Sequence, residues 1–158
     1  MKQKGEFREN RQNSPAEAGG TSREINMTID IGDFFTVDNE KQGIWYEPVN
    51  CGIEFKILGI SSDRSVTASE QYEKDLAHAE KESDPMKRKE LEKEALIRRI
   101  GAVITDVRGK DGNEILMQGK PLSFSEENIN NILSSSTIIR DALLKGISTK
   151  SNFMTKKH

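Results

Sequence analysis

This sequence contains a single cysteine, Cys51. An internal disulfide bond is therefore excluded, and a reducing compartment is the natural expectation for such a chain. No apolar run reaches the ~18 residues that a membrane-spanning helix needs. The first residues, MKQKGEFRENRQ, also lack the apolar stretch of a signal peptide. We therefore expect a cytoplasmic protein without a membrane partner.

Aromatic residues are also few, and basic and acidic residues are nearly equal in number. One Trp, two Tyr and six Phe make nine aromatics in 158 residues, and 34% of the chain is hydrophobic. This composition predicts a single domain with a modest core. The 24 basic and 26 acidic residues give a net charge of −2 and are spread along the chain. The basic footprint of a nucleic-acid-binding protein is missing, so we expect no nucleic-acid partner.

The first 24 residues are polar and charged, with Phe7 as their one large apolar side chain. They cannot bury enough surface to offset the entropy of ordering, which predicts a disordered N-terminal arm over residues 1–24. From residue 25 the pattern changes to alternation of apolar and polar residues. Ile25, Met27, Ile29 and Ile31 share one face, and Phe34, Phe35 and Val37 follow. This predicts a strand and its continuation, within a β-rich segment over residues 25–60.

A β-hairpin is predicted over residues 43–57, GIWYEPVNCGIEFKI. Apolar residues alternate with Glu54 and Lys56 in its second half, and Pro48, Asn50 and Gly52 favour a turn between the two halves. Because neighbouring residues of a strand point to opposite faces, Trp45 and Tyr46 cannot both enter the core. We expect one ring to pack inward and the other to contact a partner, and the sequence does not decide which.

A charged helical region is predicted over residues 67–107. Between Glu70 and Arg99, seventeen of thirty residues are charged, eight basic and nine acidic, which is typical of a solvated surface. The sequence Ser83-Asp84-Pro85 should divide the region into two helices, because proline suits the first turn of a helix. In the second helix, apolar residues recur at helical spacing and become denser toward Val107. We expect that end to pack on the core.

The last predicted helices lie within residues 122–146. Ser125 or Ser123 can cap the first, in which Glu126 and Glu127 follow, and a second runs from about Thr137 to Gly146, which is a plausible C-cap. The order of elements predicts an α+β fold: a small N-terminal antiparallel β-hairpin or sheet, followed by a helical C-terminal half. Apart from the disordered N-terminal arm, residues 25–154 are expected to form one domain.

Catalytic and metal-binding patterns are weak. Cys51 has no neighbouring base in the sequence, and the two histidines, His78 and His158, lie far from it. There is no paired Cys or His spacing for zinc, no EF-hand spacing in DVRGKDGNE, and no glycine-rich phosphate-binding motif. We therefore predict no catalytic residues, no metal, no cofactor and no enzymatic activity.

The segment from Ile104 to Phe153 resembles the C-terminal half of the tail assembly chaperones of long-tailed, siphovirus-like bacteriophages. The matching residues are Asp106, Gly109, Gly112, Pro121, Leu122, Phe124, Ser125, Glu127, Asn128, Leu133, Ile139, Asn152 and Phe153. Upstream, Gly43, Trp45, Phe55 and Ile57 match a similar pattern before a charged helical stretch, so the resemblance covers residues 40–154. Val107 departs from it, since the family often has tryptophan at this position.

The resemblance implies a chaperone of virion morphogenesis that works in the host cytoplasm and is absent from the mature particle. Its partners would be the tape-measure protein, which it keeps soluble, and the tail-tube protein, which it helps to recruit. Contacts are expected from Trp45 or Tyr46, Phe55, Phe124 and Ile139, and homo-oligomerisation is left open. The alternative is a structural virion protein, such as a minor tail or tail-completion component.

Overall fold

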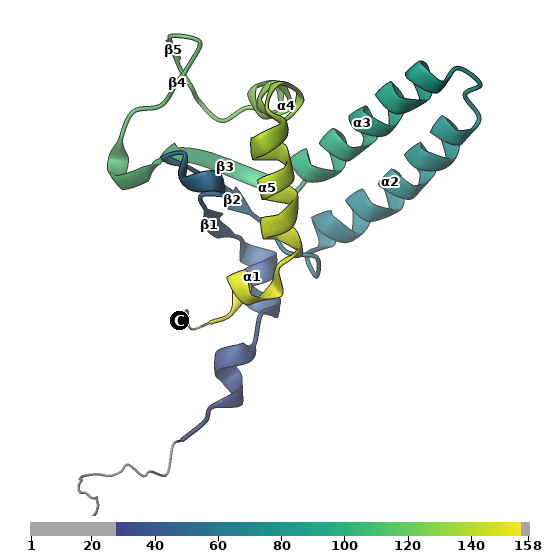
Figure 1. The fold of residues 1–158 in the computed structure, drawn as a ribbon. Coiled ribbons are helices and arrows are strands. Elements are labelled where there is room, and N and C mark those ends of the chain that lie inside the picture. Colours follow the sequence, from purple (N-terminus) through teal and green to yellow (C-terminus); the bar gives the residue numbers. More distant parts are fainter. Residues whose placement is uncertain (1–27, 156–158) are drawn as a thin grey trace, which may run out of the picture. The chain divides into compact units, whose positions relative to one another are not determined.

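The computed structural model describes residues 28–155 (Figure 1). The chain divides into two parts, Met1–Ile31 and Gly32–His158. In the first part, residues 28–30 have no regular secondary structure, and Ile31 opens the 3-10 helix η1 (Ile31–Phe34). The predicted arm, residues 1–24, and the first residues of the predicted strand, 25–27, lie outside the described residues.

The predicted strand is wrong over residues 28–37. The chain forms η1 there and then begins the short helix α1 (Val37–Gln42). The amide of Phe35 donates to the carbonyl of Gly32 at 3.1 Å, and the amide of Glu40 donates to that of Thr36 at 2.8 Å. These local bonds replace a ladder, because no strand of the described residues pairs with this segment. Alternation alone does not make a strand without a partner.

Three antiparallel strands form the main sheet, in the order β1 (Ile44–Tyr46), β2 (Ile53–Ile57) and β3 (Ile104–Gly109). The β1–β2 pair confirms the predicted hairpin, with Tyr46 opposite Phe55. A 3-10 turn, η2 (Pro48–Asn50), lies in the connection, where Val49 and Asn50 both adopt a φ of 51°. Asparagine and glycine suit such turns, whereas valine rarely adopts a positive φ.

The charged region forms two antiparallel helices, α2 (Asp63–Glu80) and α3 (Pro85–Gly101). The predicted break is confirmed, because Pro85 begins α3 and the Asp84 carboxylate accepts the amide of Met86 at 3.0 Å. The predicted extension of the second helix to Val107 is wrong. The chain leaves α3 at Gly101 and returns to the sheet as β3, which pairs with β2 along its length.

After β3, the chain makes a 3-10 turn, η3 (Lys110–Gly112), and a small separate hairpin of β4 (Leu116–Met117) and β5 (Lys120–Pro121). Helix α4 (Glu126–Ser135) is capped by Ser125 as predicted. Helix α5 (Thr137–Ser148) and the 3-10 turn η4 (Lys150–Phe153) end the described chain. The predicted C-cap at Gly146 is wrong, because this glycine lies inside α5.

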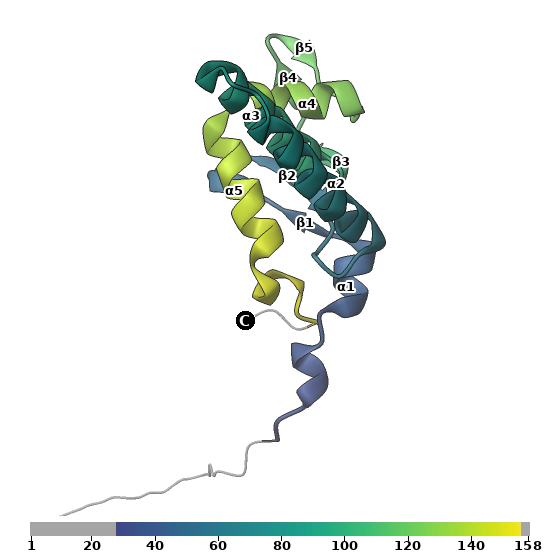
Figure 2. The same cartoon turned by 90° about the vertical axis from the view of Figure 1, so that its right-hand side faces the viewer.

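The hydrophobic core lies between one face of the three-stranded sheet and the helices α3, α4 and α5 (Figure 2). Its buried members are Phe55, Ile57, Leu58, Ile97, Ile100, Val103, Ile104, Ile129, Leu133, Leu143, Ile147 and Phe153. Phe55 and Ile57 are fully buried, since alternate residues of β2 point to this face. The result is the predicted α+β architecture, with helices on one face of a small antiparallel sheet. The opposite face carries Trp45 together with the charged side chains of Glu54, Lys56 and Arg108.

Candidate partner-binding surfaces

The side of the sheet away from the core carries Trp45. Along β1, Ile44 and Tyr46 pack against the core, so Trp45 between them lies on the other face, half-buried. The guanidinium carbon of Arg108 lies 3.9 Å from the centre of the Trp45 ring. The ammonium of Lys56, opposite Trp45 in the ladder, lies 6.0 Å from the same centre. Both distances fit cation–π contacts.

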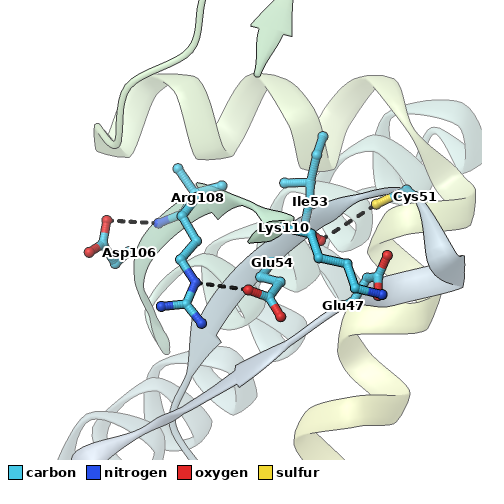
Figure 3. Close-up of polar contacts among 8 residues, drawn as sticks. Glu47, Cys51, Ile53, Glu54, Asp106, Arg108 and Lys110 are labelled. Carbon is cyan, nitrogen blue, oxygen red and sulfur yellow. Dashed lines mark hydrogen bonds and ion pairs between the residues drawn. The ribbon is translucent and has the colours of Figure 1, made fainter. Parts of the chain in front are cut away.

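Arg108 is held over the ring by Glu54, its cross-strand neighbour. The Nε of Arg108 donates to Oε1 of Glu54 at 2.8 Å, and both residues lie on the face opposite the core (Figure 3). A cross-strand pair of opposite charges stabilises a sheet and restricts the arginine side chain. Tryptophan and arginine are enriched among the residues that contribute most of the binding energy at protein interfaces. This arrangement is therefore suited to contact with another protein.

The turn beside this face is fixed by Glu47. Its Oε2 accepts the amide of Gly52 at 2.8 Å, and its Oε1 accepts the Lys110 ammonium at 3.1 Å. The hydrogen bond from Gly52 and then that from Lys110 lower the pKa of Glu47 below its ordinary value. Correspondingly, the hydrogen bond to Glu47 raises the pKa of Lys110. Both groups stay charged at neutral pH, and they join the β1–β2 turn to the end of β3.

The structure separates the other residues predicted to contact a partner. The ring of Tyr46 points inward, where a Cβ added at Gly146 would lie 2.6 Å from it. Phe55 is 0% exposed, so its prediction as a contact residue is wrong, and it is a core residue. Ile139 is half-buried against the core, and Phe124 is 43% exposed before α4. Of the five residues, Trp45 and Phe124 are thus the two that present a ring outside the core.

Cys51 lies exposed in the β1–β2 turn, where its thiol donates to the carbonyl of Ile53 at 3.6 Å (Figure 3). No base is hydrogen-bonded to its sulfur among the contacts of the described chain. Within residues 28–155, no group of three or more His, Cys, Asp or Glu side chains could hold a metal ion. In the same range, no helix is both long and apolar enough to cross a membrane.

Two further surfaces were not predicted from the sequence as contact sites. Phe34, Phe35 and Val37 are all largely exposed, although this apolar cluster is predicted to continue the strand that begins at residue 25. A groove of about 430 Å³ lies along α2 and α3, with Ala68, Tyr72 and Ala95 among its lining residues. The small side chains of Ala68 and Ala95 are the sequence signal that could have predicted the groove.

Comparison with known proteins adds no relative, because no family model, no curated protein and no solved structure matches this chain.

Proposed function

We propose that this protein is a non-enzymatic tail assembly chaperone of a long-tailed bacteriophage. It binds the tape-measure protein in the bacterial host cytoplasm, keeps it soluble and helps to recruit tail-tube subunits. The observation that carries the proposal is the outward-facing Trp45 beneath Arg108. This pair offers a preformed aromatic contact on a small domain of which 32% of the residues are charged.

The residues that carry the resemblance support the proposal through the fold. Ser125 accepts the amide of Asn128 at 3.0 Å and starts α4, while Leu133 and Phe153 are almost fully buried. Gly112 adopts a φ of 78°, a conformation that favours glycine. These residues therefore have structural roles in the described fold. The proposed function takes its partner from the resemblance, and Trp45 is the surface residue proposed to contact that partner.

Co-expression with the phage's tape-measure protein tests the proposal. The wild-type chain should raise the soluble fraction of the tape-measure protein several-fold and co-purify with it. Trp45→Ala should reduce both effects, because truncating an aromatic anchor costs about 2 kcal/mol or more of binding energy. Met86→Ala is the matched control, since Met86 is 81% exposed at the far end of the α2–α3 pair.

Thermal melts of both variants show whether the fold is intact. The chaperone proposal fails if the wild-type chain gives no rise in solubility and no co-purification. If co-purification persists in full with Trp45→Ala, the partner is held elsewhere on the surface.

A structural virion protein is the second candidate, and the exposed side chains of Phe34, Phe35 and Val37 favour it. Apolar surface of this kind is permanently covered when a subunit stays in an assembly. Quantitative mass spectrometry of purified virions separates the two functions. A chaperone should be absent from mature particles, whereas a virion component should occur there at a fixed copy number.

A further inference from the structure

An exposed apolar surface is formed by Phe34, Phe35 and Val37. These side chains are 55%, 64% and 49% exposed, and they border a hollow of about 490 Å³ that Gly32, residues 34–39 and Thr155 line. Single exposed apolar residues are common on soluble proteins, whereas adjacent large ones mark contact sites. We call Phe34, Phe35 and Val37, with Asp33 and Asp38, the acidic–apolar surface.

The backbone of the acidic–apolar surface is fixed by the C-terminal segment. The Thr155 hydroxyl lies 2.7 Å from the carbonyl oxygen of Gly32 and 3.1 Å from that of Phe35. The Asn39 side-chain amide donates to the carbonyl of Phe153 at 3.0 Å, and Phe153 is itself buried in the core. The exposed rings are therefore presented by an ordered turn, which lowers the entropy lost when a partner binds.

Acidic residues stand next to these rings in the sequence. From residue 28 to residue 41 the chain contains Asp30, Asp33, Asp38 and Glu40 and one basic residue, Lys41, in the last turn of α1. Glu40 is buried and paired with Lys150, so Asp33 and Asp38 supply the negative charge beside Phe34, Phe35 and Val37. A partner that matches this surface has apolar side chains with basic residues beside them.

The secondary structure of the acidic–apolar surface indicates whether the partner is extended or helical. Residues 28–43 contain a 3-10 turn and a short helix but no strand, so they offer no open ladder of backbone groups to an extended peptide. Recognition must use side chains, as when an amphipathic helix places its apolar stripe in a groove. We propose that the acidic–apolar surface binds an amphipathic helix of another protein, whose apolar stripe is flanked by Lys or Arg.

Two synthetic 18-residue helical peptides test this proposal with the full chain. Both carry leucines at helical spacing, and one has lysines and the other glutamates beside the stripe. By fluorescence anisotropy, the lysine peptide should bind at least about tenfold more tightly, a factor that corresponds to about 1.4 kcal/mol. Its affinity should fall as salt rises, because Asp33 and Asp38 attract it through solvent.

Three variants assign the binding to this surface. The double variant Phe34→Ser/Phe35→Ser should lower the affinity for the lysine peptide at least about tenfold. The double variant Asp33→Asn/Asp38→Asn keeps the apolar residues. It should lower the affinity for the lysine peptide and make that affinity less dependent on salt. Ile138→Ser is the matched control, because Ile138 is 68% exposed on α5, and it should leave binding unchanged.

The proposal is wrong if the wild-type chain binds both peptides with the same affinity. It is also wrong if the lysine peptide binds the Phe34→Ser/Phe35→Ser chain as tightly as the wild-type chain. Sedimentation velocity of the chain alone provides the remaining check. If the wild-type chain dimerises and Phe34→Ser/Phe35→Ser makes it monomeric, the occupant is a second copy and the proposal is wrong. The tape-measure protein takes no part in these measurements, so their failure leaves the proposed function standing.

Discussion

Glu40 is the one charged side chain that is almost fully buried within residues 28–155, at 1% exposure. Its Oε1 accepts the amide of Ser61 at 2.9 Å, and its Oε2 lies 3.3 Å from the Lys150 ammonium. Gly59 lies against it so closely that an added Cβ would collide with the Glu40 side chain. One carboxylate thus connects α1, the loop before α2 and the turn η4.

The pKa of Glu40 reflects two opposing causes. Burial alone raises it, but hydrogen bonds from Thr36, Ser61 and Lys150 together outweigh burial and lower the pKa below its ordinary value of 4.5. A carboxyl group whose pKa is lower in the folded chain stabilises the fold above its unfolded-state pKa. That stabilisation is lost as the pH falls through the folded-state pKa.

Glu40→Gln should therefore lower the free energy of unfolding by roughly 1–3 kcal/mol at neutral pH, because a charged acceptor is lost from a buried network. The difference from the wild-type chain should shrink as the pH falls from about 4.5, the ordinary pKa of the carboxyl, through the lower folded-state pKa at which the native Glu40 takes up a proton. Urea unfolding at a series of pH values measures it. Glu126→Gln, at an exposed position of α4, is the control. A difference that does not change with pH would show that the charge of Glu40 contributes nothing.

At the scale of single elements, a side-chain hydrogen bond occupies a backbone donor of the edge strand β3. In β3, the carboxylate of Asp106 accepts the amide of Val107 at 2.8 Å (Figure 3). The amide of Lys110 donates to Gly52 of the β2 side at 2.9 Å, so by alternation the amide of Val107 faces away from β2. Asp106 therefore occupies a donor on the open edge of the sheet, which reduces pairing with another chain.

Ser136 is shared by two helices. It ends α4, and its hydroxyl accepts the amide of Ile139 at 3.1 Å in the first turn of α5. Because both helices pack on the core, the direction of the chain at this one residue positions Leu133 on one side and Leu143 on the other.

Ser136→Ala should reduce the free energy of unfolding by about 1 kcal/mol, with a range of roughly 0.5–2, since an N-cap hydrogen bond is removed. Ser136→Asp should restore most of the loss, because aspartate also caps helices and complements the helix dipole. Thermal unfolding followed by circular dichroism measures both. The sharing of one cap by two helices would be unimportant if Ser136→Ala melted like Ser134→Ala, a variant of an exposed serine within α4.

At the scale of the whole described unit, Gly32 to Thr155, stability is uneven. Helix α2 packs mainly on α3, whereas α3 also contacts α4 and α5. The two helices run away from the sheet toward their connection at residues 81–84 (Figure 1). The ion pair between Arg98 and Asp75, at 3.1 Å, joins them at the surface, and exposed pairs of this kind contribute little.

Hydrogen exchange should therefore distinguish two regions. Amides near the connection, from about Leu76 to Leu91, should exchange faster than those of β2 and α5, because local opening there exposes little apolar surface. Mass spectrometry at neutral pH measures the difference in the full chain. Equal protection in both regions would contradict this expectation, and it would show that the α2–α3 pair opens only with the whole fold.

Much of the fold could be predicted because its signals are local. The alternation around Phe55, the break at Asp84-Pro85 and the cap at Ser125 each act within a few residues, so the sequence alone determined the hairpin, the division of the helices and the start of α4. The candidate site was predicted only in part. Trp45 was identified as an alternative to Tyr46, without a means of choosing between them.

Tertiary structure decided the rest. Ile104–Gly109 became a strand because β2, far earlier in the chain, offers it a pairing partner, although its apolar spacing also suits a helix. The segment with Phe34 and Phe35, predicted to continue a strand, has no such partner among the described strands, and its rings are exposed. Tyr46 faces inward because Gly146 of α5 leaves room for its ring, and Trp45 is thereby directed to Arg108. Local chemistry fixes what an element can be, whereas its neighbours in space determine which of its faces is buried.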